Sequence, residues 1–195
     1  PPAYFPENVM MNIKGYESLD EVMQRGSHAL SPEAFEVAAN ETEALVLDVR
    51  EAQTFAKGFI PNAINIGIEG QFASWVGTLI PDLKQPILLV TEPGKEEETI
   101  TRLARVGYDN CIGYLQGGIQ AWKDAGKEAD TVTSISAEAF SNLLAENPTL
   151  AAFDVRKKSE YDSEHVIGVE NLPLDFLNEN MAQINPDKTY YLHCA

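Results

Sequence analysis

Residues 44–50 read Ala-Leu-Val-Leu-Asp-Val-Arg, and residues 150–156 read Leu-Ala-Ala-Phe-Asp-Val-Arg. Each stretch is a short, nearly continuous apolar run that ends in the same three residues. Runs of this kind are typical of strands that are buried on both faces of a parallel sheet. The repetition predicts that one folding unit occurs twice in the chain.

The segments around these two strands repeat as well. Residues 30–35 recur as residues 135–140, and both read as helix starts in which a serine, Ser31 or Ser136, is the N-cap. Further matches join 58–66 with 164–172 and 87–91 with 190–194. The last match aligns Thr91 with Cys194.

Beyond this point only the first copy continues. Its sequence predicts a helix over 96–106, a strand over 110–115 and a short helix over 119–125. Strands that alternate with helices indicate a parallel sheet covered on both faces. The expected fold class is therefore α/β, a three-layer α/β/α arrangement with a central parallel sheet, as one complete domain plus one truncated copy.

These matches set the expected domain boundaries. Residues 1–26 are interpreted as a linker from a missing upstream domain, because the chain begins Pro-Pro-Ala without a Met. Residues 27–130 form the complete first copy. Residues 131–195 are the N-terminal part of a second copy, truncated at its Cys.

Composition excludes several classes of partner. The formal net charge of −16 repels nucleic acid and anionic lipid, so neither is expected as a partner. No stretch reaches the roughly 20 apolar residues of a membrane span. Two distant cysteines and no secretory leader indicate a cytoplasmic protein. Cys111 lies in an apolar strand and is expected in the core, and neither cysteine has a metal-ligand neighbour, so we expect no metal or other cofactor in this chain.

Taken together, the motifs resemble the rhodanese domain. The resemblance is carried by the two Asp-Val-Arg stretches, by residues 58–66 and 164–172, and by Leu-Gln-Gly-Gly-Ile-Gln-Ala-Trp over 115–122. It implies sulfane-sulfur transfer through a Cys persulfide, with thiosulfate or a low-molecular-weight persulfide as the donor. Cys194 would be the catalytic sulfur carrier of the intact parent protein, in a loop that stabilises its thiolate. Because that loop is absent, we expect this chain itself to be inactive.

The same resemblance gives structural roles to five other residues, which are Asp48, Arg50, Asp154, Arg156 and His165. Each arginine is expected to pair with a local carboxylate, and His165 is expected to hold a turn by hydrogen bonds. The alternatives are general acids for the aspartates and a proton shuttle for the histidine. Strand alternation should point His193 away from the face of Cys194.

In the first copy the corresponding loop is degenerate and comprises Thr91, Glu92, Pro93, Gly94, Lys95 and Glu96. A threonine hydroxyl is too basic for persulfide chemistry, and Pro93 removes a backbone N–H donor. Glu96 and the two glutamates after it place negative charge where an anion would bind. Phe59 also stands where the second copy has His165. The first copy is therefore predicted not to be a sulfurtransferase.

The opening residues 1–12 resemble the segment that joins a metallo-β-lactamase-fold domain to tandem rhodanese domains in bacterial fusion proteins. This resemblance implies an upstream domain of a hydrolase or a persulfide dioxygenase, with zinc or iron bound only there. Three hypotheses stay open: sulfur transfer by the parent, a purely non-catalytic module for packing or dimerisation, and a rhodanese-fold phosphatase with a longer loop. The exposed sheet edge of the second copy favours a homodimer.

Overall fold

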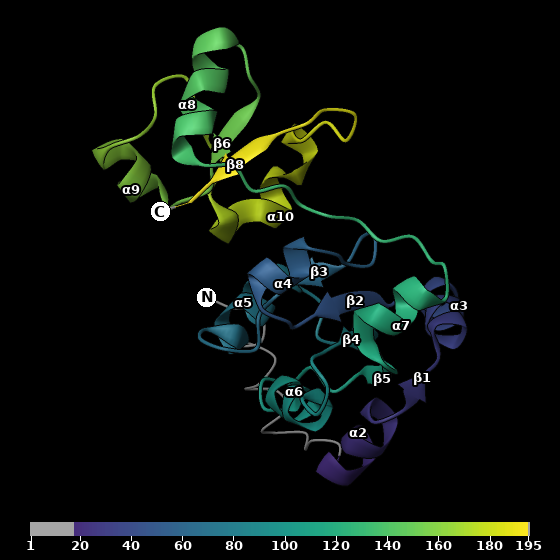
Figure 1. Cartoon of the computed structure of the whole chain (residues 1–195). Helices are drawn as coiled ribbons and strands as arrows, with labels where there is room; N and C mark the ends of the chain where they lie inside the picture. The colour runs from purple at the N-terminus through teal and green to yellow at the C-terminus, as the bar shows by residue number, and fades with distance from the viewer. Residues whose placement is uncertain (1–17, 195) are drawn as a thin grey trace. The chain divides into compact units, whose positions relative to one another are not determined.

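The computed structural model describes residues 18–194, and the chain divides between Thr133 and Ser134 into two compact units (Figure 1). The sequence pattern placed this boundary near residue 130. In chain order the elements of the first unit are α2 (Leu19–Gly26), β1 (Ala29–Leu30), α3 (Pro32–Thr42), β2 (Leu45–Asp48), α4 (Ala52–Ala56), β3 (Ile64–Asn65), α5 (Phe72–Leu79), β4 (Ile87–Val90), α6 (Glu96–Ala104), β5 (Cys111–Leu115) and α7 (Gly118–Asp124).

The strands of the first unit form one sheet in the order β1-β5-β4-β2-β3. Every pair in it is parallel. In the central pair, Leu47 of β2 lies opposite Leu89 of β4, and Asp48 lies opposite Val90. The loops that follow β2 and β4 therefore leave the sheet side by side at its carboxyl edge.

The side chains of β4 alternate between two cores, one on each face of the sheet. Ile87 and Leu89 pack into a core with residues of α2, α5 and α6. Leu88 and Val90 pack into a second core with residues of α3 and α7. All four β4 side chains are 0% exposed, and burying each stabilises the fold by about 1.5–3 kcal/mol. The expected three-layer α/β fold with a central parallel sheet is confirmed.

Helix α2 corrects the expected boundary of the first copy. Residues 1–26 were assigned to a linker, but Leu19–Gly26 form a helix. Its Val22 is 1% exposed and belongs to the same core as the buried residues of α6. Ser18 caps this helix and exchanges hydrogen bonds with Glu21 in a capping box. The first folded unit therefore begins before residue 27. The rest of the predicted linker, residues 1–17, lies outside the described residues.

The predicted helix starts are confirmed, and one helix end differs. The Ser31 hydroxyl accepts a hydrogen bond from the Ala34 N–H, and Ser136 caps α8 of the second unit in the same way. Helix α6 ends at Ala104 rather than at residue 106. The reason is Gly107, whose φ of 88° turns the chain so that the Tyr108 N–H bonds the Leu103 carbonyl.

The second unit repeats the central part of the first. Its elements are α8 (Ala137–Glu146), β6 (Ala152–Asp154), α9 (Lys158–Ser163), β7 (Glu170–Asn171), η1 (Leu174–Phe176), α10 (Leu177–Asn180), η2 (Met181–Gln183) and β8 (Tyr191–His193). Its parallel sheet has the order β7-β6-β8, which corresponds to β3-β2-β4 of the first unit. In register, Asp154 lies opposite His193.

Strand β8 of the second unit is an edge strand, whereas its counterpart β4 is central. Within residues 18–194 it pairs only with β6. Leu192 in the middle of β8 is 64% exposed, although Leu89 at the matching place in β4 is fully buried. The second unit therefore presents an apolar strand that in the first unit is covered by α6 and β5.

Candidate functional site

The candidate site lies at the carboxyl edge of the second sheet. Asp154 ends β6, and His193 ends the neighbouring strand β8. Cys194 follows directly, and its side chain is an exposed free thiol. Because the two strands are parallel and in register here, the thiol-bearing residue is delivered beside the Asp154 carboxylate and its partners.

Asp154 and Arg156 form a closed network at this edge. The Arg156 guanidinium donates to both Asp154 carboxylate oxygens, the shortest bond being 2.6 Å from Nη2 to Oδ2. The Arg156 backbone N–H donates to the same carboxylate at 2.9 Å, and Nη2 also reaches the Glu164 carbonyl at 2.8 Å. Asn171 Nδ2 donates to the carbonyls of Asp154 and Arg156 at 2.9 and 3.0 Å. These bonds fix the loop that follows β6.

The first unit builds the same network from Asp48, Arg50 and Asn65. Arg50 Nη2 lies 2.6 Å from Asp48 Oδ2 and donates to the Gly58 carbonyl at 2.9 Å. Asn65 Nδ2 donates to the Asp48 and Arg50 carbonyls at 3.0 Å each. This ion pair is almost completely buried, with side chains 4% and 1% exposed. The four charged residues singled out by sequence are thus brought into two equivalent ion pairs.

At the second site, Asp154 and Arg156 change each other's pKa values. Hydrogen bonds from Arg156 hold the pKa of the Asp154 carboxyl below its ordinary value, and the nearby His193 adds a smaller lowering effect. The pKa of Arg156 is raised, first by its hydrogen bond to Asp154 and, as the smallest contribution, by the charge of Cys194. The charge of Arg156 is thus engaged first by Asp154, and its interaction with Cys194 is minor.

His193 lies opposite Asp154 in the strand register and directly precedes Cys194. Its Nε2 is 3.7 Å from Asp154 Oδ2, and within residues 18–194 this nitrogen makes no hydrogen bond. The ring lies 6.3 Å from that of Phe140 in α8, so it occupies the α8 face of the sheet. In the first unit this place is taken by the buried Val90. The histidine is a feature of the second copy alone.

His165 packs on the aromatic ring of Tyr161. It stacks on Tyr161 with ring centroids 4.0 Å apart, and its Nδ1 lies 2.9 Å from the Tyr161 carbonyl oxygen. In the first unit Phe55 and Phe59 stack in the same way at 4.2 Å. The stacking contact is therefore common to both copies. His165 differs from Phe59 by its hydrogen bond with the Tyr161 carbonyl.

In the first unit the loop from Thr91 to Lys95 joins β4 to α6. Thr91 is only 5% exposed, and Gly94 takes a φ of 84°, which favours glycine. Lys95 Nζ pairs with Glu98 at 2.7 Å, and this hydrogen bond raises the pKa of Lys95. The remaining predicted loop residues, Glu92, Pro93 and Glu96, surround this turn. The lysine of the loop is thus directed to a glutamate of its own helix.

Both cysteines are free, but their environments differ. Cys111 is fully buried in β5, and this burial raises its pKa to about 12. A thiol with that pKa is inert at neutral pH, whereas the exposed Cys194 is open to reagents. Cys111 is a core residue, as its apolar neighbours predicted.

Two kinds of feature are missing from residues 18–194. No three His, Cys, Asp or Glu side chains in this part of the chain gather in an arrangement that holds a metal ion. None of its helices has the length and apolar character that a membrane span requires.

Asn65 and Asn171 are site residues that sequence reasoning missed, although both stand at matching positions of the repeated stretches 58–66 and 164–172.

Known proteins resemble part of the chain. The chain is 29% identical over 68 residues to the "Putative sulfur carrier protein YrkF" of Bacillus subtilis, covering 35% of this chain and 37% of that protein. It is 30% identical over 104 residues to the adenylyltransferase and sulfurtransferase uba4 of Pyricularia oryzae, covering 44% of this chain and 21% of that protein. This chain therefore spans well under half the length of these curated relatives.

Among solved structures, the rhodanese-like domain of the Anabaena protein Alr3790 matches with a TM-score of 0.47 and 19% identity, over 57% of this chain and 86% of that domain. The rhodanese-like domain family matches the chain twice, over residues 31–125 and 136–195. The first match spans β2, the degenerate loop and α7, and the second spans β6, β8 and Cys194. The chain therefore belongs to the rhodanese-like domain family, of whose domain it carries two copies.

Proposed function

We propose that the second copy carries sulfane sulfur on Cys194 as a persulfide and that the first copy is a non-catalytic module of the same protein. One observation carries this proposal: an exposed thiol follows β8 beside the Asp154–Arg156 pair, where the first copy has the buried Thr91 after β4. The family is one of sulfur-transfer modules, and the names of two curated relatives refer to sulfur carriage and sulfur transfer.

The proposed reaction has two steps. The Cys194 thiolate attacks the outer sulfur of thiosulfate, a new S–S bond forms, and the original S–S bond breaks to release sulfite. The terminal sulfur of the persulfide is then attacked by an acceptor such as cyanide, which leaves as thiocyanate while the thiolate is restored. No net oxidant is consumed.

The first copy is proposed to contribute packing rather than chemistry. Thr91 has no basic group to activate it in its loop, because Lys95 is paired with Glu98. The helix start carries Glu96, Glu97 and Glu98, which oppose an incoming anion. A role as a scaffold or interaction module for a partner domain follows from an intact fold without a nucleophile.

The second copy is proposed to act within a longer bacterial, cytoplasmic protein that supplies the loop after Cys194 and an upstream metallo-β-lactamase-like domain, a hydrolase or a dioxygenase. Zinc or iron would be bound in that upstream domain. The support is the resemblance of residues 1–12 to the joining segment of such fusions and the short share of the curated relatives that this chain spans.

The test is intact mass spectrometry of this chain and of the longer protein after treatment with thiosulfate, with and without dithiothreitol. We expect the longer protein to gain the mass of one sulfur atom on Cys194, in a form that dithiothreitol removes. The same protein should form thiocyanate from thiosulfate and cyanide. Absence of both signals would refute sulfur carriage.

Two cysteine variants control this experiment. Cys194→Ser should abolish the adduct, whereas Cys111→Ser should leave it unchanged, because Cys111 is buried with a raised pKa. An adduct that survives in the Cys194→Ser protein would place the chemistry elsewhere. If the Cys194 thiol is alkylated readily but never gains sulfur, the competing function is favoured, in which both copies mediate packing or dimerisation of an upstream metallohydrolase.

A further inference from the structure

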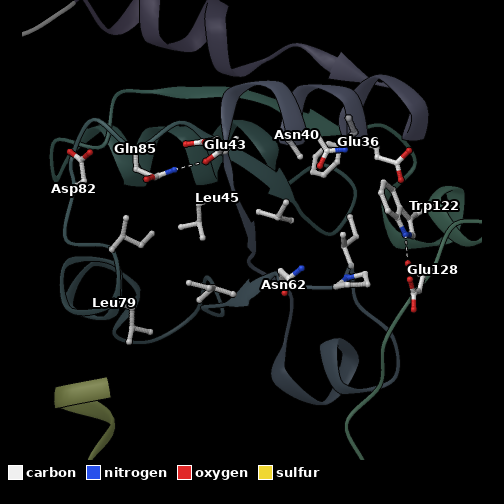
Figure 2. Close-up of a pocket in the computed structure, with 18 of the residues that line it drawn as sticks. Glu36, Asn40, Glu43, Leu45, Asn62, Leu79, Asp82, Gln85, Trp122 and Glu128 are labelled. Atoms are coloured by element: carbon white, nitrogen blue, oxygen red, sulfur yellow. Dashed lines mark hydrogen bonds between the residues drawn. The ribbon is translucent and has the colours of Figure 1, made fainter. Parts of the chain in front are cut away.

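A pocket of about 570 Å³ lies in the first unit (Figure 2). Its lining includes Leu45 and Ile64, which are the first residues of β2 and β3, and Gln85, which precedes β4. These positions mark the amino edge of the parallel sheet. Thr91 follows the last residue of β4 at the opposite edge, so the pocket is separate from the degenerate loop.

The apolar part of the pocket wall is firmly held. Phe35, Val46, Ile60, Ile80 and Trp122 line it, and each of these side chains is at most 8% exposed. The Trp122 indole N–H is fixed by a 2.6 Å hydrogen bond to the Glu128 carbonyl, which Figure 2 shows at one end of the pocket. Volumes of roughly 300–1,000 Å³ with apolar walls are typical of small-molecule sites.

The charged side chains that line the pocket are all acidic. Glu36, Glu43, Asp82 and Glu128 line it, and no lysine or arginine is among the described residues that do so. Lys127, next to the rim, pairs with Glu36 and lies 5.3 Å from the centre of the Trp122 ring. The protein thus already holds one ammonium group between a carboxylate and this indole, and three further carboxylates are left around the pocket.

The neutral polar groups also favour a hydrogen-bond donor. Gln85 donates its amide N–H to the Glu43 carbonyl at 2.8 Å, which leaves its side-chain oxygen as an acceptor. The side chains of Asn40 and Asn62 line the pocket and make no hydrogen bond to other residues of the described range 18–194. Their amide oxygens are available to a ligand. The pocket therefore combines apolar walls with oxygen acceptors.

Backbone conformation singles out the same place. Among residues 18–194, Glu43 and Asn62 are the non-glycine residues with positive φ, at 51° and 64°, and both line the pocket. The second copy has Gly168 at the position of Asn62, with φ 87°. Glu43 takes this conformation as the C-cap of α3, and at the second position the first copy keeps the Asn62 side chain where the second copy has glycine.

We propose that this pocket binds a small organic cation, an ammonium or guanidinium group carried on an apolar body. The apolar body would pack on Trp122 and the aliphatic walls, and the cation would lie at the acidic rim of the pocket, to which Glu43 and Glu128 contribute from different ends. The second copy has Ser141 and Ala145 at the positions of Glu36 and Asn40, so the site belongs to the first copy. This binding role goes beyond the proposed sulfur chemistry and does not depend on it.

Three probes with one apolar body and different head groups test the proposal on the full chain: phenylbutylamine, phenylbutanol and phenylbutyrate. Amide shifts in a titration followed by nuclear magnetic resonance give both the affinity and the residues affected. We expect the amine to shift pocket residues and to bind at least about fivefold more tightly than the alcohol, with the carboxylate weakest. The advantage of the amine should shrink as salt is added.

Matched variants locate the charge effect. Combined Glu43→Gln and Glu128→Gln should weaken the amine at least about fivefold and leave the alcohol unchanged. Asn62→Gly, which fits the positive φ, should weaken the amine while the fold stays intact. Glu97→Gln on α6 removes one charge away from the pocket and should change nothing.

Three results would overturn the proposal. They are equal binding of amine and alcohol, shifts that lie outside the pocket, and a loss with Glu97→Gln as large as with the pocket variant. The blocked tripeptide acetyl-Leu-Lys-Leu-amide is a fourth probe and tests whether the occupant is a peptide. If it binds about tenfold more tightly than the amine, the occupant is a basic peptide and the assignment to a small cation is wrong.

Discussion

At the scale of single residues, each Asp-Val-Arg stretch folds its arginine back onto its own aspartate. The Arg50 side chain is 4% exposed, whereas that of Arg156 is 20% exposed. A buried carboxylate is tolerated only with an opposite charge and hydrogen bonds around it. Because both oxygens of Asp48 and of Asp154 are already engaged by an arginine, these groups hold loops in place and are poorly arranged to act as general acids.

Replacing Arg50 by alanine should destabilise the first unit by about 3–5 kcal/mol, because the Asp48 carboxylate stays buried without a counter-charge. The bond to the Gly58 carbonyl is lost as well. Arg156→Ala should destabilise the second unit less, because the more exposed Arg156 can be replaced by water. Amide hydrogen exchange across a urea series measures both units separately.

The control for these variants is an exposed ion pair, Lys158 with Asp162, whose side chains are 74% and 55% exposed. Lys158→Ala should change the free energy of unfolding by less than about 1 kcal/mol. A loss for Arg50→Ala no larger than for Lys158→Ala would contradict the structural role of the buried pair.

Acidification should destabilise the second unit through Asp154. Hydrogen bonds from Arg156 hold the folded-state pKa of this carboxyl below its ordinary value of 3.8, so as pH falls the unfolded chain takes up the proton first. The contribution of Asp154 to stability is therefore complete above the unfolded pKa and is lost as pH falls through the folded pKa. Hydrogen exchange of β6 and β8 amides from neutral to acid pH measures this loss.

Comparison with two asparagine variants isolates this effect from that of other carboxylates. Asp154→Asn should flatten the acid part of the stability curve, since no proton is then taken up at this position. Asp162→Asn changes a 55% exposed carboxylate and should keep the curve of the parent chain. Identical curves for all three proteins would show that Asp154 does not contribute.

At the scale of elements, the matching strands β4 and β8 lead to different residues. Strand β4 leads to the buried Thr91 and to α6, whose first turn carries three glutamates. Strand β8 leads to the exposed Cys194. The helix start is well suited to its own stability, since acidic groups there favour the helix dipole, but the same charges disfavour an anionic sulfur donor.

Introducing a thiol into the first loop should therefore not create a sulfurtransferase. In a Cys194→Ser background, Thr91→Cys is expected to gain no sulfur adduct from thiosulfate, because the position is 5% exposed and the helix after its loop begins with three glutamates. Intact mass spectrometry after thiosulfate, and after iodoacetamide as a test of access, measures both properties. Turnover of thiosulfate by this variant would show that only the nucleophile is missing from the first copy.

Local signals explain how much of the fold the sequence predicts. Strands β2, β4 and β5 have continuous apolar runs, and Ser31 and Ser136 cap the helices that they begin. Helix α2 was missed because it is short and mostly polar. The capping pair Ser18 and Glu21, with an apolar residue directly after it, was the available signal.

The candidate sites also differ in how far a local sequence signal predicts them. The ion pairs at Asp48 and Asp154 join residues two apart in sequence, so a repeated motif points to them. The pocket of the first unit is lined from α3, β2, β3, α5, α7 and several connecting loops, and no single motif encodes it. Features built from distant segments need the three-dimensional arrangement before they can be recognised.

At the scale of the whole molecule, the unpaired edge of β8 should promote association of two chains. Leu192 is 64% exposed on a strand that pairs with β6 alone among residues 18–194, and an uncovered apolar strand edge is a template for pairing with another chain. We expect concentration-dependent dimers in sedimentation experiments. Leu192→Lys should weaken the dimer at least about tenfold, because a charge on an edge strand opposes pairing.

The matched control is Val37→Lys, which places the same charge on an apolar side chain of α3 that is 53% exposed. If association runs through β8, this variant should dimerise like the parent chain, since a helix face offers no free strand hydrogen bonds. Equal weakening by both lysines would indicate general charge repulsion or another contact surface. A chain that stays monomeric at every concentration would refute the prediction and show that the β8 edge is protected in solution.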